Sequence, residues 1–261
     1  MDLGLRGRIA VVGGATSGLG RASADALAAE GCDLVIWSRD EARLARTADE
    51  LRGTHGIRVA HVAADAATAE AAGTVADAAL EFGPIDIIVS NAGGPPTSDP
   101  TATDREAWMR AFELLAATPI ELVTRLLPGM RERRWGRVVA ILSSGVRQPI
   151  PDLVYSTGGR SVLAAWLKTT ARAIAAEGVT LNGVMPGRLA TPRIHELDSG
   201  RAERDGTSEE EVRAMHIGTI PAGRYGRPEE LGALVAFLAS DRASYITGQM
   251  VAVDGGLIAG L

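Results

Sequence analysis

The chain has 261 residues, of which 46% are hydrophobic, enough for one well-buried core and near the upper size of a single domain. The formal net charge of −5 gives no electrostatic reason to expect a nucleic acid or an anionic membrane as a partner. The apolar runs are only as long as strands and the N-terminus does not resemble a signal peptide, so we expect a cytoplasmic protein. Cys32 is the single cysteine, which excludes an internal disulfide and a cysteine-rich metal site, and we predict no metal.

Short, nearly continuous apolar runs alternate with helical patterns along the whole chain. Such runs are typical of parallel strands that are covered by helices on both faces. The runs are Ile9–Val12, Leu34–Trp37, Val59–Ala63, Ile85–Ser90, Arg137–Leu142, Thr180–Met185 and Met250–Val253. The sequence therefore predicts an α/β fold, a doubly wound parallel sheet of about seven strands, in a single domain over residues 1–261.

The first predicted strand runs into a glycine-rich turn and then into an amphipathic helix. Gly14, Gly18 and Gly20 have the spacing G-x-x-x-G-x-G. Glycines let the backbone turn sharply and approach an anion, and the helix that follows presents free N–H groups to phosphate. With a second strand about 20 residues later, this order predicts a dinucleotide site. We include Ser17 and Leu19 of the same turn among its contacts.

The end of the second predicted strand indicates which dinucleotide is bound. An acidic residue here would accept a hydrogen bond from the ribose 2′-hydroxyl, whereas an arginine can pair with a 2′-phosphate. The chain has Ser38 and Arg39 at this point, so we predict NADP(H) rather than NAD(H). Asp40 is placed to cap the next helix.

Small and polar residues also follow the third and fourth strands, where parallel strands end at one crevice. Asp65 and Ala66 follow the third strand, and Asn91, Ala92 and Gly93 follow the fourth. After the sixth strand, the charge-rich stretch 188–225 is the one long irregular region that we expect, and its position suits a substrate lid.

Taken together, these residues resemble the short-chain dehydrogenase/reductase family over essentially the whole chain. The matching motifs are Gly14-x-x-x-Gly18-x-Gly20, Asp65, Ser90-Asn91-Ala92-Gly93, Ser143-Ser144, Tyr155, Asn182, Pro186-Gly187 with Thr191, and Val253-Asp254-Gly255-Gly256. The resemblance implies a Rossmann-type fold, a homotetramer, and further cofactor contacts at Pro186, Gly187, Leu189 and Thr191.

The resemblance also implies a catalytic tetrad, which this chain matches only in part. Ser144 and Tyr155 match its serine and tyrosine, but Leu115 stands at the asparagine position and Gly159 at the lysine position. The chain therefore looks like the subgroup similar to 3-oxoacyl-carrier-protein reductases that has an incomplete tetrad. Pro119 has no N–H for the carbonyl of Leu115, which predicts a kinked helix that holds a water or serves packing alone.

The absent lysine matters because a tyrosine with a pKa near 10 needs a nearby positive charge to shuttle protons at neutral pH. Lys168, the only lysine, is 13 residues past Tyr155, roughly 20 Å along a helix. Arg160 is the nearest cation in sequence, but it points about 140° away, so it would have to curl back or the Gly158-Gly159 pair would have to distort the helix. Arg160 is either catalytic or paired with the cofactor, a neighbouring chain or solvent.

Four other residues are candidates for substrate contact. Arg147 and Arg188 lie in loops beside the expected crevice and could bind an anionic group, and His195 and His216 lie in the expected lid. Two histidines without companion ligands do not make a metal site.

We predict an oxidoreductase that transfers hydride between NADP(H) and a small carbonyl or alcohol substrate, with Tyr155 donating the proton and Ser144 orienting the substrate oxygen. Two alternatives stay open: an NADP(H)-binding sensor or structural partner with little redox activity, and non-redox acid/base chemistry that uses Tyr155. The helices expected at about 104–130 and 154–177 carry more apolar residues than one sheet face needs, which predicts a homo-oligomer, a tetramer or a dimer.

Overall fold

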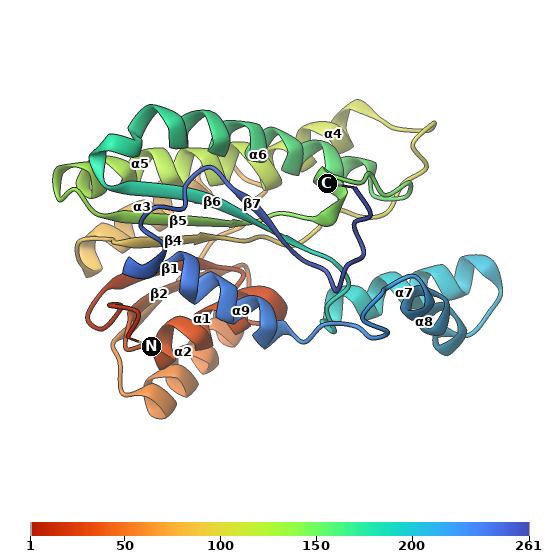
Figure 1. Ribbon diagram of the computed structural model, residues 1–261, viewed down its shortest axis with the longest axis horizontal. Coiled ribbons are helices and arrows are strands. Elements are labelled where there is room, and N and C mark those ends of the chain that lie inside the picture. The colour runs from red at the N-terminus through yellow and green to blue at the C-terminus, as the bar shows by residue number, and fades with distance from the viewer. Residues whose placement is uncertain (1, 261) are drawn as a thin grey trace.

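Seven parallel strands form one twisted sheet at the centre of the computed structural model, which describes residues 2–260 (Figure 1). The strand order is β3-β2-β1-β4-β5-β6-β7. The strands are β1 (Ile9–Gly13), β2 (Asp33–Ser38), β3 (Val59–Ala63), β4 (Ile87–Ser90), β5 (Gly136–Ile141), β6 (Val179–Pro186) and β7 (Met250–Val253). This order, which reverses direction between β1 and β4, confirms the predicted doubly wound α/β fold.

Helices cover both faces of the sheet (Figure 1). One layer consists of α1 (Gly18–Ala29), α2 (Glu41–His55) and α9 (Pro228–Leu238). The other layer consists of α3 (Ala71–Phe82), α4 (Arg105–Phe112), α5 (Thr118–Glu132) and α6 (Val154–Ile174). Neighbouring residues of one strand enter different cores: Val11 packs in the second layer and Val12 in the first. That is why the strands read as continuous apolar runs.

Side-chain caps fix several helix ends. Asp40 accepts a hydrogen bond from the backbone N–H of Arg43 at 3.0 Å, which confirms its predicted role as the N-cap of α2. The same helix ends at Gly56, whose φ of 67° is left-handed.

A π-helical turn, Glu113–Ala117, separates α4 from α5. The N–H of Thr118 bonds to the carbonyl of Glu113, five residues back, and Pro119 follows at the start of α5. The helical hydrogen bonding is therefore interrupted where the missing N–H of Pro119 predicted a kink. The hydroxyl of Thr118 donates to the carbonyl of Ala66 at 2.9 Å, so the kink is tied to the loop after β3.

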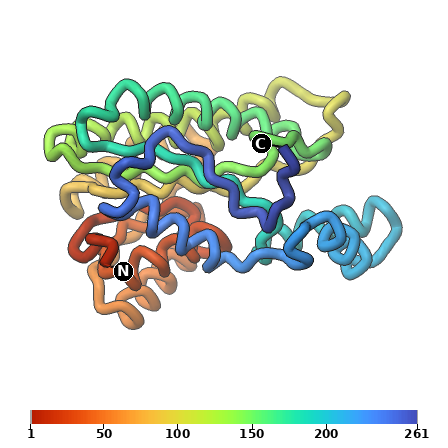
Figure 2. The backbone as a smooth tube through the Cα atoms, in the orientation of Figure 1, coloured from red at the N-terminus to blue at the C-terminus, as the bar shows by residue number. Residues whose placement is uncertain are grey.

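The stretch 188–225, called the lid below, is not irregular as the sequence suggested. It contains α7 (Pro192–Asp205) and α8 (Glu209–Gly218), which project from the carboxyl end of the sheet (Figures 1 and 2). Thr191 caps α7, and Ser208 with Glu211 forms a capping box on α8. The prediction was wrong because these helices are highly charged and bury few residues, which weakens the apolar periodicity that marks a helix.

Gly159 provides a test of the packing between α6 and the π-helical turn. A Cβ at Gly159 would lie 2.9 Å from the Cβ of Leu115 and 3.1 Å from the carbonyl oxygen of Ala111. We expect Gly159→Ala to destabilise the fold by about 1–3 kcal/mol, seen as a lower Tm, because neither neighbour can rotate away. Restoring a lysine at this position would meet the same obstacle.

The matched control is Gly53→Ala in α2, where a Cβ has no neighbour within 4 Å. This change should leave the Tm unchanged or raise it, since alanine has the higher helix propensity. A Gly159→Ala variant as stable as the starting protein would contradict the packing described here.

Candidate active site

The glycine turn after β1 is held against the loop after β4. Asn91 donates from Nδ2 to the carbonyl of Gly13 at 3.1 Å. Gly14 has a φ of 59°, and a Cβ there would lie 2.6 Å from the same Asn91 nitrogen. A Cβ at Gly20 would lie 2.3 Å from the carbonyl oxygen of Gly14. Both positions therefore require glycine, and the two loops meet at the switch point of the sheet.

The start of α1 fits the diphosphate of a dinucleotide. Its N-cap, Ser17, makes no capping hydrogen bond, and the first turn carries no acidic side chain. The free N–H groups at this end are therefore available to an anion. Gly18 has a φ of 56°, and the neighbour of a Cβ there would be Thr191, 3.5 Å away, so Thr191 of the lid faces the glycine turn.

The end of β2 fits the adenosine part of NADP(H). The hydroxyl of Ser38 is buried and has no hydrogen-bond partner among the described residues. Arg39 follows on the surface, where its guanidinium can reach a ligand. Nearby, the carboxylate of Asp65 accepts from the N–H of Ala67 at 3.0 Å and shapes the loop after β3.

A small hollow lies beyond the carboxyl ends of β4 and β5. It is lined by Ser90, Asn91, Ala92, Leu114, Leu115, Pro119, Ile141, Arg160 and Leu163. The π-helical turn supplies one wall and α6 the other. Ser90, Asn91 and Arg160 contribute polar groups to the hollow, and Arg160 is the charged side chain among these lining residues.

Arg160 is held in place without a counter-charge. Its Nη1 donates to the carbonyl of Ile141 at 3.0 Å, and its Nε donates to the hydroxyl of Ser156 at 3.3 Å. No carboxylate of residues 2–260 lies within ion-pair distance of it. Burial lowers the pKa of Arg160 to about 10, with a contribution from the charge of Arg193. The guanidinium is still charged at neutral pH and can stabilise an anion or an oxyanion.

The structure does not bring Tyr155 and Arg160 together. The hydroxyl of Tyr155 accepts a hydrogen bond from the N–H of Asp104 at 3.0 Å, and its ring packs edge-on against Trp108 with centroids 4.9 Å apart. The possibility that Arg160 curls back to Tyr155 is wrong: Arg160 reaches Ser156, four residues before it and on the same side of α6.

Ser156 is the residue that sequence reasoning missed. Its signal is the four-residue spacing to Arg160, which equals the spacing between the tyrosine and the lysine of the family, counted from the residue after Tyr155.

The serines after β5 have unequal environments. Ser144 is buried at the start of a 3-10 turn, Ser144–Val146, and does not line the hollow. Ser143 is half-buried, and its hydroxyl accepts from the N–H of Gly145 at 3.0 Å. The catalytic assignment of Ser144 remains a prediction.

Other candidates have structural partners. Asn182 donates to the carbonyl of Ile246 at 2.8 Å and holds the approach to β7. Lys168 donates to the carbonyl of Gly248 at 2.9 Å in the same region. His195 is exposed and pairs with Glu209 of the lid. Arg147 is exposed at the surface.

The lid contacts the body across the crevice. Arg193 of α7 donates to the carbonyl of Pro95 in the loop after β4, at 2.5 Å, and Arg204 donates to Asp152 at 3.3 Å. At its base, Leu189 forms a parallel bridge with Gly226. The lid therefore lies over the loop that joins the glycine turn to the hollow.

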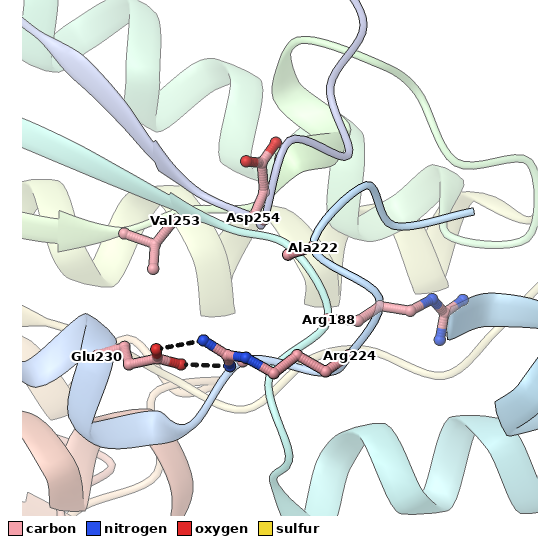
Figure 3. Close-up of a pocket in the computed structure, with 8 residues that line it drawn as sticks. Arg188, Ala222, Arg224, Glu230, Val253 and Asp254 are labelled. Carbon is pink, nitrogen blue, oxygen red and sulfur yellow. Dashed lines mark hydrogen bonds and ion pairs between the residues drawn. The ribbon is translucent and has the colours of Figure 1, made fainter. Parts of the chain in front are cut away.

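A second, larger hollow of about 160 Å³ lies below the base of the lid (Figure 3). It is lined by Arg188, Ala222, Arg224, Gly226, Glu230, Val253, Asp254 and Gly255. Two hydrogen bonds of 2.6 and 2.9 Å join Arg224 to Glu230, and they help lower the pKa of Glu230 to about 2. Among the predicted site residues, only Arg188 borders this hollow, and its side chain extends away from Arg224 and Glu230.

The chain is similar to known proteins over nearly its whole length. The model of a family described as enoyl-(acyl carrier protein) reductase matches residues 14–258. D-beta-hydroxybutyrate dehydrogenase of Cupriavidus necator is 31% identical over 98% of this chain and 99% of its own length. The 3-oxoacyl-[acyl-carrier-protein] reductase of Salmonella typhimurium is also 31% identical, over 98% and 99%. L-sorbose reductase from Gluconobacter frateurii, solved with NADPH and L-sorbose, superposes with a TM-score of 0.95 at 32% identity over 100% of both chains.

The fold and the glycine turn define a dinucleotide-binding α/β protein. The chain belongs to the short-chain dehydrogenase/reductase family, as its motifs indicated. Within residues 2–260, no helix combines the length and the apolar character needed to cross a membrane.

Proposed function

We propose that this protein is an NADPH-dependent reductase that transfers hydride to the carbonyl carbon of a small substrate and catalyses the reverse oxidation of the alcohol. The observation that carries the proposal is Arg160, a cation that no carboxylate of residues 2–260 pairs with, at the wall of the small hollow beside the predicted cofactor contact Asn91. Relatives over the whole chain that are named as reductases or dehydrogenases support it. The comparisons give no support to the binding-only and non-redox alternatives.

The proposed cofactor site follows the carboxyl edge of the sheet. The N–H groups of the turn from Gly14 to Gly20 and the hydroxyl of Thr191 bind the diphosphate, and Ser38 and Arg39 bind the 2′-phosphate. Asp65 and Ala66 border the adenosine. Asn91, Ala92, Gly93, Pro186, Gly187 and Leu189 position the nicotinamide half over the hollow. NADPH supplies the hydride.

The proposed role of Arg160 is to stabilise the negative charge that develops on the substrate oxygen as hydride reaches the carbon. A cation in a partly buried, fixed position does this more effectively than one in water, because no solvent must reorganise. Ser156 keeps the guanidinium oriented.

Two proton donors follow from this arrangement. Tyr155 is the donor expected from the sequence. The alternative is a solvent water that protonates the new oxyanion, while Arg160 stays charged and stabilises it.

The first prediction separates these donors. Arg160→Gln should lower kcat/KM by about 100-fold or more, the usual effect of removing one group that stabilises a developing oxyanion. Arg160→Lys should keep part of the activity. Tyr155→Phe should change it by less than about tenfold, because the Tyr155 hydroxyl bonds to Asp104 rather than to Arg160. NADPH oxidation over a panel of ketones, 3-oxo acids and ketoses provides the measurement. An inactive Tyr155→Phe beside an active Arg160→Gln would reverse the assignment.

The second prediction concerns the cofactor. NADPH should bind at least tenfold more tightly than NADH, equivalent to about 1.4 kcal/mol, and Arg39→Ala should remove the difference. Fluorescence titration with NADPH and with NADH measures the two dissociation constants. Arg43→Ala, one turn further along at an exposed position of α2, is the matched control and should keep the preference. Equal affinities in the starting protein would show that Arg39 does not select the phosphate.

The third prediction concerns assembly. We propose that the protein is a homo-oligomer, and the tetramer implied by the family resemblance is the expected state. We also propose that it is located in the cytoplasm. Met109, Phe112 and Val162 are 55%, 41% and 42% exposed, and they lie on the adjoining helices α4 and α6. Burying such a patch favours association. Light scattering at micromolar concentration should give a multiple of 27.2 kDa, and a 27.2 kDa monomer would contradict the proposal.

A further inference from the structure

The base of the lid contains a cluster of buried polar side chains that the proposed reaction does not use. It consists of Asp198 from α7, His216 from α8, and Arg188 and Tyr225 from the two segments that connect these helices to the sheet. Asp198, His216 and Tyr225 are 2%, 7% and 7% exposed. We call these four residues the lid cluster.

The carboxylate of Asp198 is the centre of the lid cluster. Its Oδ1 lies 3.0 Å from Nη1 of Arg188 and 3.0 Å from Nδ1 of His216. Its Oδ2 accepts from the hydroxyl of Tyr225 at 2.7 Å. Burial and the bond to Asp198 raise the pKa of Tyr225 to about 12, so this hydroxyl keeps its proton. The Asp198 carboxylate therefore links α7 and α8 to the segment before α7 and to the segment after α8.

The contacts of His216 define its protonation state. Nε2 lies 2.8 Å from a guanidinium nitrogen of Arg188 and 3.4 Å from one of Arg201. A guanidinium can only donate, so Nε2 must present its lone pair. Nδ1 then carries the proton and faces Asp198. The imidazole is neutral, in agreement with a pKa of His216 that burial and the charge of Arg188 lower despite the opposite effect of Asp198.

We propose that the lid cluster is a proton-sensitive lock, in which neutral His216 holds the lid closed and protonated His216 releases it. A second proton would place an N–H of His216 against the N–H of Arg188 at 2.8 Å. It would also add a positive charge beside Arg188 and Arg201, with Arg213 over the ring of Tyr225 at 5.2 Å. Among residues 2–260, Asp198 is the one carboxylate in contact with the ring.

Opening of the lid would affect the cofactor site through the two segments that connect the lid helices to the sheet. Arg188 lies between Gly187 and Leu189, and its side chain leaves the hollow of Figure 3 to join the cluster. The lid that it anchors carries Thr191, which faces the glycine turn. Asp198 and His216 are therefore positioning residues for the lid, and this inference stands apart from the proposed reaction.

The direction of the pH effect follows from the pKa of His216. In the open lid this pKa returns to its ordinary value near 6.5, above the value in the closed lid. The open state then binds more protons, so closure is fully favoured above about pH 6.5. It weakens as the pH falls below 6.5 toward the pKa of the closed state.

Hydrogen exchange of the full-length protein, without substrate or cofactor, tests the proposal. Protection factors corrected for the intrinsic effect of pH should fall at least threefold over residues 192–218 between pH 7.5 and pH 5.5, while those of β1, β4 and β5 stay constant. In His216→Gln the fall should disappear, because a glutamine amide can donate to Asp198 and accept from Arg188 without titrating. Asp198→Asn should lower lid protection at both pH values.

His195→Gln is the matched control, since His195 is the exposed lid histidine that pairs with Glu209. This variant should keep the fall in protection. NMR titration of the imidazoles in the unaltered protein gives a second test that needs no variant, and His216 should titrate below 6.5. Constant lid protection in the unaltered protein, a fall that persists in His216→Gln, or a His216 pKa above 6.5 would each overturn the proposal. None of these outcomes depends on whether the protein reduces carbonyls.

Discussion

The candidate site is built around one unusual feature, a guanidinium at the wall of a small hollow with no carboxylate of the described residues within ion-pair distance. Burying an unpaired cation costs several kcal/mol, and the backbone carbonyl of Ile141 and the hydroxyl of Ser156 offset only part of that cost for Arg160. The π-helical turn and α6 enclose the hollow, and Gly159 lets them approach closely. The fold thus keeps a positive charge where an oxygen of cofactor or substrate can be stabilised. This is the property on which the proposed reduction relies.

The glycine turn and the lid both contact the loop after β4. Gly14 and Gly20 let β1 approach the loop after β4, where Asn91 fixes the distance. The lid approaches this loop from outside through Arg193 and the carbonyl of Pro95. The base of the lid is in turn fixed by the buried carboxylate of Asp198. The contacts of the lid thus end on the same loop that carries Asn91.

The sheet was predictable because its central strands, such as β1, β4 and β5, are buried on both faces, which leaves continuous apolar runs that are shorter than a helix. The edge strands β3 and β7 are only half-buried. The lid helices were predicted as irregular because α7 and α8 bury few apolar side chains, although Thr191-Pro192 and Ser208 with Glu211 are helix-start signals that could have been read. The glycine turn, Asn91 and Thr191 come together as expected. Tyr155 and Arg160 do not, because helix phase decides which side chains meet, and Ser156 lies on the same side of α6 as Arg160.

Transfer of deuterium tests the central claim directly. The protein would be incubated with NADPH carrying deuterium at C4 of the nicotinamide and with each ketone of the panel, and the products analysed by mass spectrometry and NMR. Hydride transfer in the hollow predicts one deuterium on the new carbinol carbon, on a single face, at a rate that falls with Arg160→Gln. Turnover without deuterium at that carbon, or with equal deuterium on both faces, would contradict the account.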